Sequence, residues 1–273
     1  MTPRNVPKNV AASVQARLLN LARERGEDFQ LVLTRYALER LLYRLSRSPH
    51  REEFVLKGAM LFQVWSDEPH RPTRDLDLLG RGANTAEQYT SIFRDLAAEP
   101  VEEDGLTFVT DTIRAEQIRE SQEYNGLRLQ FEARLANVRI PIQIDIGVGD
   151  AMTPGPIEIE FPTLLDFPPP LLLAYSRETV VAEKFQAMVM LGMINTRMKD
   201  FFDLWILSKE YDFDGVTLTG AIRATFDRRA TELPSQFPSL FPPSSRMTRG
   251  SRPNGRLLSE RGSCRLERRI SGR

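Results

Sequence analysis

Leucines recur with the period of an α-helix over residues 29–47. They stand at i, i+3, i+4 and i+7: Leu38, Leu41, Leu42 and Leu45. This spacing forms the apolar stripe of an amphipathic helix, and an earlier helix is expected over residues 10–24. Arginines follow a similar period on another face of the same helix: Arg40, Arg44, Arg47 and Arg51. We interpret this row as a solvated flank in preference to a phosphate-contacting face.

A strict alternation of apolar and polar residues predicts a strand over residues 138–146, where every second residue is Val or Ile. Pro141 lacks the N–H that a strand donates to its neighbour, so this strand is expected near a sheet edge or bulged there. Shorter strands are expected over residues 54–56, 74–79, 106–113 and 126–135. Helices are expected over residues 86–98, 177–193, 196–210 and 219–230.

Composition limits the classes of protein that this chain of 273 residues represents. It is 41% hydrophobic and 27% charged, as in globular proteins, and it has no apolar run long enough to cross a bilayer. A single cysteine excludes a disulfide framework and makes a reducing, cytoplasmic location the expected one. With two histidines no His/Cys zinc site forms, so any metal is held by carboxylates, which favours Mg²⁺ or Mn²⁺.

The net charge of zero hides an asymmetry. Residues 244–273 hold nine arginines and two glutamates, a balance of +7, which leaves −7 on the rest of the chain. Proline, serine, glycine and arginine dominate from residue 234 onwards, so residues 234–273 are expected to be a basic, largely disordered tail. The acidic body has no overall nucleic-acid footprint.

Three aspartates stand on predicted strands. Asp75 and Asp77 are two residues apart, so both side chains point to one face of the strand. Such carboxylates repel each other when ionised, and a divalent cation removes that cost. If the strand of Asp145 is a neighbour, three carboxylates converge where two Mg²⁺ ions can hold a nucleoside triphosphate. Taken singly, each residue is also consistent with a surface aspartate on a strand.

Lys57-Gly58 ends one predicted strand and begins a helix. At such a position backbone N–H groups and the helix dipole favour phosphate, and the ammonium of Lys57 adds charge. Asp150 follows two glycines and is interpreted as a turn residue.

The predicted helices of the second half hold further charged residues. Asp200 and Asp203 share a helix face, and an ordinary surface pair of Lys199 with Asp203 is the simplest interpretation. A buried Lys184 facing the carboxylate cluster would instead hold triphosphate or have a lowered pKa.

Four segments in order resemble the AbiEii/AbiGii-type nucleotidyltransferase toxins of bacterial toxin–antitoxin systems. They are FVLKGAMLF (54–62), RPTRDLDLL (71–79), IQIDIGVGD (142–150) and VAEKFQAMVMLGMINTRMKDFFDLW (181–205). Their order is a glycine turn, a D-x-D strand, a third carboxylate, and then A-E-K and (R/K)-D-x-x-D helices. The resemblance covers roughly residues 10–230.

The resemblance implies an α+β fold with a polymerase-β-like nucleotidyltransferase core and a mixed sheet. The core is expected over residues 51–165, after an N-terminal helical segment (1–50) and before a helical C-terminal portion (166–233).

The resemblance also implies roles for individual residues. Mg²⁺ or Mn²⁺ would be bound by Asp75, Asp77 and Asp145, which are catalytic together with Asp200. Nucleotide would be bound by Lys57, Gly58 and Lys184. The expected partners are NTP, a cognate antitoxin protein and an acceptor tRNA whose modification stops translation.

Our first hypothesis is therefore an Mg²⁺-dependent enzyme that transfers a nucleoside monophosphate from NTP to an acceptor hydroxyl, on tRNA. Nucleotidylation of a small molecule or a protein is the alternative, and the acidic body fits it better than an RNA acceptor. A catalytically inactive remnant that only binds antitoxin is a second alternative. A nuclease is a third, because two-metal carboxylate sites also cleave phosphodiesters.

Overall fold

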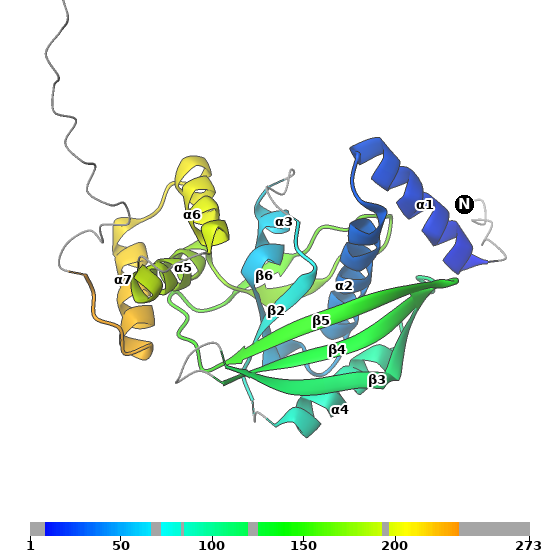
Figure 1. Ribbon diagram of the computed structural model, residues 1–273, viewed down its shortest axis with the longest axis horizontal. Helices are drawn as coiled ribbons and strands as arrows, with labels where there is room; N and C mark the ends of the chain where they lie inside the picture. The colour runs from blue at the N-terminus through cyan, green and yellow to red at the C-terminus, as the bar shows by residue number, and fades with distance from the viewer. Residues whose placement is uncertain (1–8, 67–71, 83–84, 120–124, 193–196, 235–273) are drawn as a thin grey trace, which may run out of the picture. The chain divides into compact units, whose positions relative to one another are not determined.

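The computed structural model describes residues 9–66, 72–82, 85–119, 125–192 and 197–234 (Figure 1). The chain divides into two units, residues 1–238 and 239–273, and every described residue lies in the first. The tail predicted to be disordered is residues 234–273, and from residue 235 onwards it lies outside the described residues. Within those ranges, no helix has both the length and the apolar character that a membrane span requires.

A single mixed sheet of seven strands organises the described part of the chain. The strand order is β3-β4-β5-β2-β1-β7-β6. β2 pairs in parallel with β5 and antiparallel with β1, and β7 pairs in parallel with β1. The strands are β1 (Phe54–Lys57), β2 (Asp75–Gly80), β3 (Leu106–Arg119), β4 (Asn125–Leu135), β5 (Val138–Val148), β6 (Ile157–Glu160) and β7 (Leu171–Ala174).

Helices precede and follow the sheet strands. They are α1 (Val10–Arg25), α2 (Phe29–Arg47), α3 (Phe62–Trp65), α4 (Ala86–Ala98), α5 (Arg177–Leu191), α6 (Met198–Glu210) and α7 (Gly215–Arg228). Two 3₁₀ turns cover Arg51–Glu53 and Gly58–Leu61. The predicted α+β fold with a mixed sheet between N-terminal and C-terminal helices is confirmed. β7 joins this sheet although it lies within the segment expected to be helical, residues 166–233.

Local capping explains where several helices begin. α2 starts after Asp28, whose carboxylate accepts the backbone N–H of Leu31 at 2.9 Å. α5 starts after Ser176, whose hydroxyl accepts the N–H of Thr179 at 3.2 Å. A side-chain acceptor at this position satisfies one of the N–H groups that a helix start leaves unpaired.

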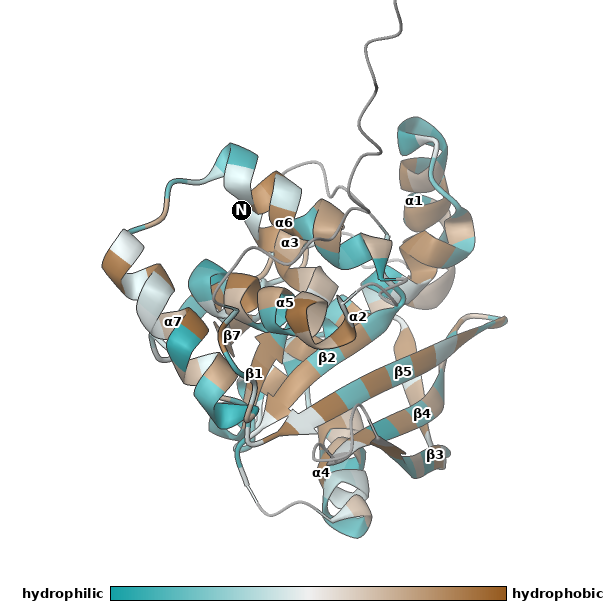
Figure 2. Ribbon diagram, turned by 60° about the vertical axis from the view of Figure 1, so that its left-hand side comes forward, coloured by the Kyte–Doolittle hydropathy of each residue, from teal (hydrophilic) through white to brown (hydrophobic). Residues whose placement is uncertain are grey.

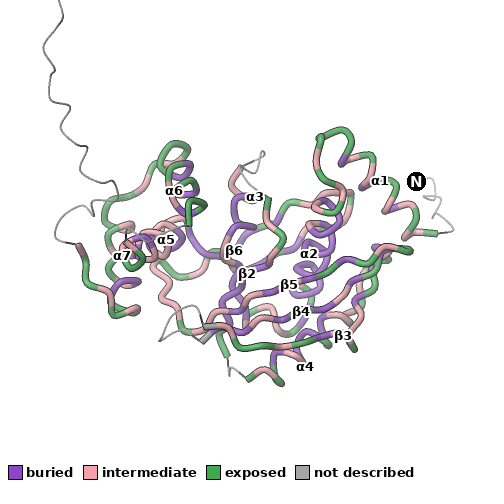
Figure 3. The backbone as a smooth tube through the Cα atoms, in the orientation of Figure 1, coloured by how far each residue is buried: buried purple, intermediate pink, exposed green. Residues whose placement is uncertain are grey.

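Along β3, β4 and β5 the core lies on one face of the sheet, where α2 packs against β5 and α4 packs against β3, whereas β1 is buried on both faces. Alternate bands of hydrophobic and hydrophilic residues run along β4 and β5 in Figure 2, and α2 is buried along most of its length in Figure 3. The isoleucines of β5 are buried in this core: Ile140, Ile142, Ile144 and Ile146. The intervening polar residues of β5 therefore face the opposite side of the sheet.

The prediction of an edge strand is wrong for β5 as a whole, because β5 lies between β4 and β2. Pairing with β2 begins at Gln143, whereas Pro141 is paired with Glu132 of β4. Among the described strands, β5 thus has one neighbour at Pro141, and a missing N–H is tolerated where a strand is locally unpaired.

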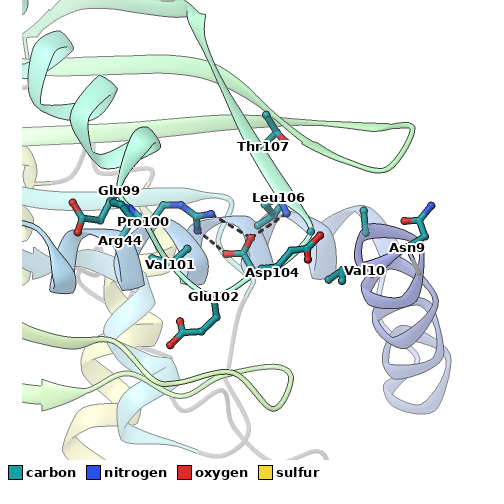
Figure 4. A pocket seen from close by; sticks show the side chains of 13 residues that line it. Asn9, Val10, Arg44, Glu99, Pro100, Val101, Glu102, Asp104, Leu106 and Thr107 are labelled. Carbon is teal, nitrogen blue, oxygen red and sulfur yellow. Dashed lines mark hydrogen bonds and ion pairs between the residues drawn. The ribbon is translucent and has the colours of Figure 1, made fainter. Parts of the chain in front are cut away.

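The solvated interpretation of the arginine row is wrong for Arg40 and Arg44, whose side chains are 0% and 6% exposed. Both guanidinium groups pair with Asp104, at 3.2 Å from Arg40 and 2.6 Å from Arg44. Figure 4 shows the Asp104 carboxylate between Arg44 and the backbone N–H of Leu106. This cluster lies beside a cavity of about 630 Å³. Its arginines are held by a protein carboxylate, so they are not a phosphate-contacting face.

Candidate active site

The three predicted carboxylates share one face of the sheet. Asp77 on β2 is in direct register with Asp145 on β5, and Asp75 is two residues earlier on β2. Paired residues of neighbouring strands point to the same side of a sheet, as do residues two apart. Burial and the nearby negative charge of Asp145 raise the pKa of Asp75 above its ordinary value. The structure therefore brings Asp75, Asp77 and Asp145 together.

Arg128 occupies the next position in the same row of residues across the sheet. It lies on β4 in register with Asp145, and its Nε and Nη2 each donate to one oxygen of that carboxylate at 2.8 Å. Hydrogen bonding to Asp145 raises the pKa of Arg128, so this cation stays charged. Such a bidentate contact fixes both the position and the orientation of the Asp145 carboxylate.

Gly58 lies directly against Asp77. Its backbone has φ of +73°, and a β-carbon there would overlap Asp77 Oδ2 and lie 2.6 Å from Asp77 Cβ and Cγ. Only glycine combines this left-handed conformation with the absence of a side chain. The turn predicted to contact phosphate is thus adjacent to the second aspartate of the D-x-D pair.

The ammonium of Lys57 points into a buried charged cluster. Its Nζ lies 2.7 Å from Asp150 Oδ2 and 3.3 Å from Glu183 Oε2. Arg229, just after α7, donates to the same two acids at 2.9 and 3.1 Å. Burial alone would lower the pKa of Lys57, but Glu183, Tyr175 and Asp150 outweigh it and raise that pKa.

Asp150 is therefore not a simple turn residue. Burial raises the pKa of Asp150, but the charges of Lys57 and Arg229 outweigh this effect, lower the pKa and keep Asp150 ionised. Because Glu183 is on α5, this cluster connects the end of β1 to the C-terminal helices.

A second buried cluster surrounds Lys184 on α5. Its Nζ lies 2.9 Å from Asp200 Oδ1 and 2.7 Å from Asp203 Oδ2, both on α6. Arg197 also contacts Asp200, at 2.7 Å. The surface-pair interpretation of Lys199 with Asp203 is wrong, because Asp203 is buried and pairs with Lys184.

The segments that carry these residues match a known family. A family model described as nucleotidyl transferase AbiEii toxin, type IV toxin–antitoxin system, matches residues 40–258. The chain belongs to this family. An AbiEii chain is a nucleotidyltransferase toxin, which implies a nucleotide substrate and a cognate antitoxin.

Two solved structures are similar to this AbiEii chain at low sequence identity. One is JHP933 from Helicobacter pylori, with 14% identity, coverage of 73% of this chain and 79% of the other, and a TM-score of 0.48. The other, also from H. pylori, is described as a candidate nucleotidyltransferase, with 15% identity, coverage of 73% and 78%, and a TM-score of 0.47. No curated protein matches the sequence.

The carboxylates differ in how well they suit a divalent cation. Asp75 and Asp77 supply hard oxygen donors on one face, and Mg²⁺ typically binds one or two carboxylates together with substrate phosphates. Both oxygens of Asp145 already accept hydrogen bonds from Arg128. In the described ranges, no three acidic, histidine or cysteine side chains are arranged as a group that could hold a metal ion. Asp75 and Asp77 thus offer oxygen donors of the kind that Mg²⁺ or Mn²⁺ binds.

Sequence reasoning missed Arg128 and Arg229. Neither has a motif, and each reaches its acidic partner only through tertiary structure: β4–β5 register for Arg128, and the packing of α7 near the end of β5 for Arg229. For Arg128, the polar position opposite Asp145 in the next strand is the one signal that the pattern of alternation contains.

Proposed function

We propose that this AbiEii chain transfers a nucleoside monophosphate from NTP to a hydroxyl group of RNA, with tRNA as the acceptor, in an Mg²⁺-dependent reaction that stops translation. The observation that supports it best is the register of Asp77 with Asp145, with Asp75 on the same face and the Gly58 turn against Asp77. This arrangement combines a phosphate-contacting turn with a set of mutually repelling acids at one place.

The transfer is an in-line displacement at the α-phosphorus. The acceptor oxygen forms a bond to this phosphorus while the bond to the oxygen bridging to the β-phosphate breaks, and pyrophosphate leaves with that electron pair. Asp145 takes the proton of the acceptor hydroxyl. Each oxygen of Asp145 accepts one N–H of Arg128 and retains a further lone pair for this proton.

Asp75 and Asp77 would hold Mg²⁺ or Mn²⁺, which would supply positive charge to the triphosphate oxygens. The Gly58 turn offers backbone N–H groups to the leaving phosphates, and the absence of a side chain at Gly58 lets Asp77 lie directly against this turn.

Lys184 and Asp200 act together in this proposal. Asp200 and Asp203 hold the ammonium of Lys184 in place, and Lys184 contributes charge to the nucleotide phosphates. Lys57 was predicted to contact phosphate as well. Its ammonium is engaged by Asp150 and Glu183, so we assign Lys57 to positioning the Gly58 turn, and its direct contact with phosphate stays a prediction.

The test uses α-³²P-labelled NTPs, total RNA and a pair of isosteric variants. Asp75→Asn removes a metal-binding charge, whereas Asp111→Asn, at an exposed position of β3, is the control. We expect Mg²⁺-dependent label on RNA with the wild type and the control, and at least a 100-fold loss with Asp75→Asn. Burial and repulsion raise the pKa of Asp75, so its negative charge does not stabilise the folded chain. The Asp75→Asn variant should therefore be at least as stable as the wild type.

Other outcomes assign other activities. Label on protein or on a small molecule would identify that molecule, and not RNA, as the acceptor. Shortened, unlabelled RNA would indicate a nuclease. Retention of full transfer by Asp75→Asn would overturn the proposed active site.

A further inference from the structure

A cavity of about 570 Å³ lies beside Asp75, the first residue of the D-x-D pair. It includes Asp75 and is lined by side chains from α2, the segment before β2, β4 and β5: Gln30, Thr34, Arg74, Gln130, Phe131 and Gln143. We call it the acceptor pocket. Its volume is in the range of pockets that hold one small molecule or one nucleotide.

Strand register places this pocket two residues along the strands from the row formed by Asp77, Asp145 and Arg128. Asp75 is in register with Gln143, and Gln143 is in register with Gln130, just as Asp77 is in register with Asp145. The two amides are hydrogen-bonded, with Gln130 Nε2 donating to Gln143 Oε1 at 3.1 Å. A row of carboxylates is therefore followed, on the same face, by a row of amides.

The direction of the reaction assigns the pocket to the acceptor. Gly58 follows β1, which pairs with one side of β2, so the leaving pyrophosphate lies on the β1 side of the D-x-D pair. Gln143 and Gln130 of the pocket are on β5 and β4, on the other side of β2, as is the proposed base Asp145. Because the attacking and leaving oxygens are in line on opposite sides of the phosphorus, the attacking hydroxyl enters from the β5 side, where the pocket lies.

The chemistry of the lining suits a nucleotide. Glutamine amides donate to and accept from base edges, and single-stranded RNA is recognised through such contacts. Arg74, whose side chain is 71% exposed, provides a positive charge for a phosphate near the mouth of the pocket. Apart from Arg74 and Asp75 the lining is uncharged, which favours a neutral base over a second charged group.

We infer that the acceptor pocket binds the terminal nucleotide of an acceptor RNA strand, the nucleotide that carries the attacking hydroxyl. This inference rests on the proposed function, because it assumes that the Gly58 turn binds the triphosphate.

The test separates acceptor binding from nucleotide binding. Gln30→Ala and Gln130→Ala each remove an exposed amide from the pocket, and Gln88→Ala, an exposed amide on α4, is the matched control. We expect each pocket variant to raise the KM for RNA about 3- to 10-fold, the effect of one lost hydrogen bond, while the KM for NTP and the control stay within about twofold. Circular dichroism melts verify that the exposed substitutions leave the fold intact.

A binding measurement without NTP gives an independent readout. The probe is a mixed-sequence RNA dodecamer carrying fluorescein at its 5′ end, compared with the same RNA labelled at its 3′ end. The 3′ label should weaken binding by the wild type, and the loss from Gln130→Ala should not depend on salt, because an amide contact releases no counterions.

The outcomes distinguish the two proposals. If the wild type labels RNA but the pocket variants leave the KM for RNA unchanged, the acceptor assignment is wrong and the proposed function stands. If the variants raise the KM for NTP instead, the pocket binds the incoming nucleotide. If the wild type labels no RNA and binds neither dodecamer, the proposed function itself fails.

Discussion

Replacing Gly58 by alanine tests whether the close contact between the Gly58 turn and Asp77 is needed to position the D-x-D pair. The residue has φ of +73°, and its missing β-carbon would lie 2.6 Å from Asp77 Cβ and Cγ. Ordinary contacts of a β-carbon begin at 3.4 Å, so Asp77 must move by roughly 1 Å to accommodate the methyl group. Asp77 is also held in register with Lys57 and Asp145, so this movement displaces a carboxylate of the candidate site.

Two costs add in Gly58→Ala. The left-handed conformation costs a non-glycine residue about 1–2 kcal/mol, and overpacking typically costs about 1–3 kcal/mol more. A misplacement of about 1 Å at a reacting centre reduces rates by about 100-fold. The variant should therefore lose about 2–5 kcal/mol of unfolding free energy and about 100-fold in transfer activity.

Gly26→Ala is the matched control, because Gly26 has φ of +64° but nothing lies within 4 Å of its β-carbon position. It should lose only the conformational cost, about 1–2 kcal/mol, and retain full activity. Urea denaturation followed by circular dichroism measures the stabilities, and label transfer measures the activities. If Gly58→Ala matches Gly26→Ala in both measurements, the contact between Gly58 and Asp77 has no role in the site.

Two further predictions concern buried charges. Asp104→Asn leaves the guanidinium groups of Arg40 and Arg44 without an anion, so urea denaturation should show a loss of about 3–5 kcal/mol, and a loss below about 1 kcal/mol would contradict this. Burial raises the pKa of Glu39 from 4.5 to about 7, so the folded chain retains a proton that the unfolded chain releases. The Glu39 contribution to stability is therefore complete below about pH 4.5 and declines by roughly 3 kcal/mol as the pH rises through 7. Glu39→Gln should remove this decline, and parallel stability curves for the two proteins between pH 4.5 and 8 would refute the assignment.

The local elements were predictable because their signals are local. The leucine stripe lies within one stretch of chain, and α2 covers the predicted residues 29–47. The alternation over residues 138–146 likewise predicted β5 and which of its side chains are buried. Such patterns predict a helix or a strand from the residues of the segment itself, without information about distant parts of the chain.

Partners far apart in sequence were not predictable in this way. Arg40 and Arg44 resembled a solvated flank, because the carboxylate that neutralises them is contributed by Asp104, more than 50 residues later. The pattern of glycines around Asp150 suggested a turn, and only folding brings it to Lys57 and Arg229. Whether a charged residue is exposed or buried depends on its partner, and periodicity contains no information about distant partners.

The candidate site divides in the same manner. By itself the sequence determined the acids, their strands and the face that each occupies, because strand alternation is a property of the backbone. Tertiary structure alone decided that β2 and β5 are parallel neighbours with Asp77 opposite Asp145, that Arg128 holds Asp145, and that the amides of Gln143 and Gln130 lie in register with Asp75. Strand order and register are set by the packing of the whole sheet, and a shift of one residue would turn these side chains to the other face.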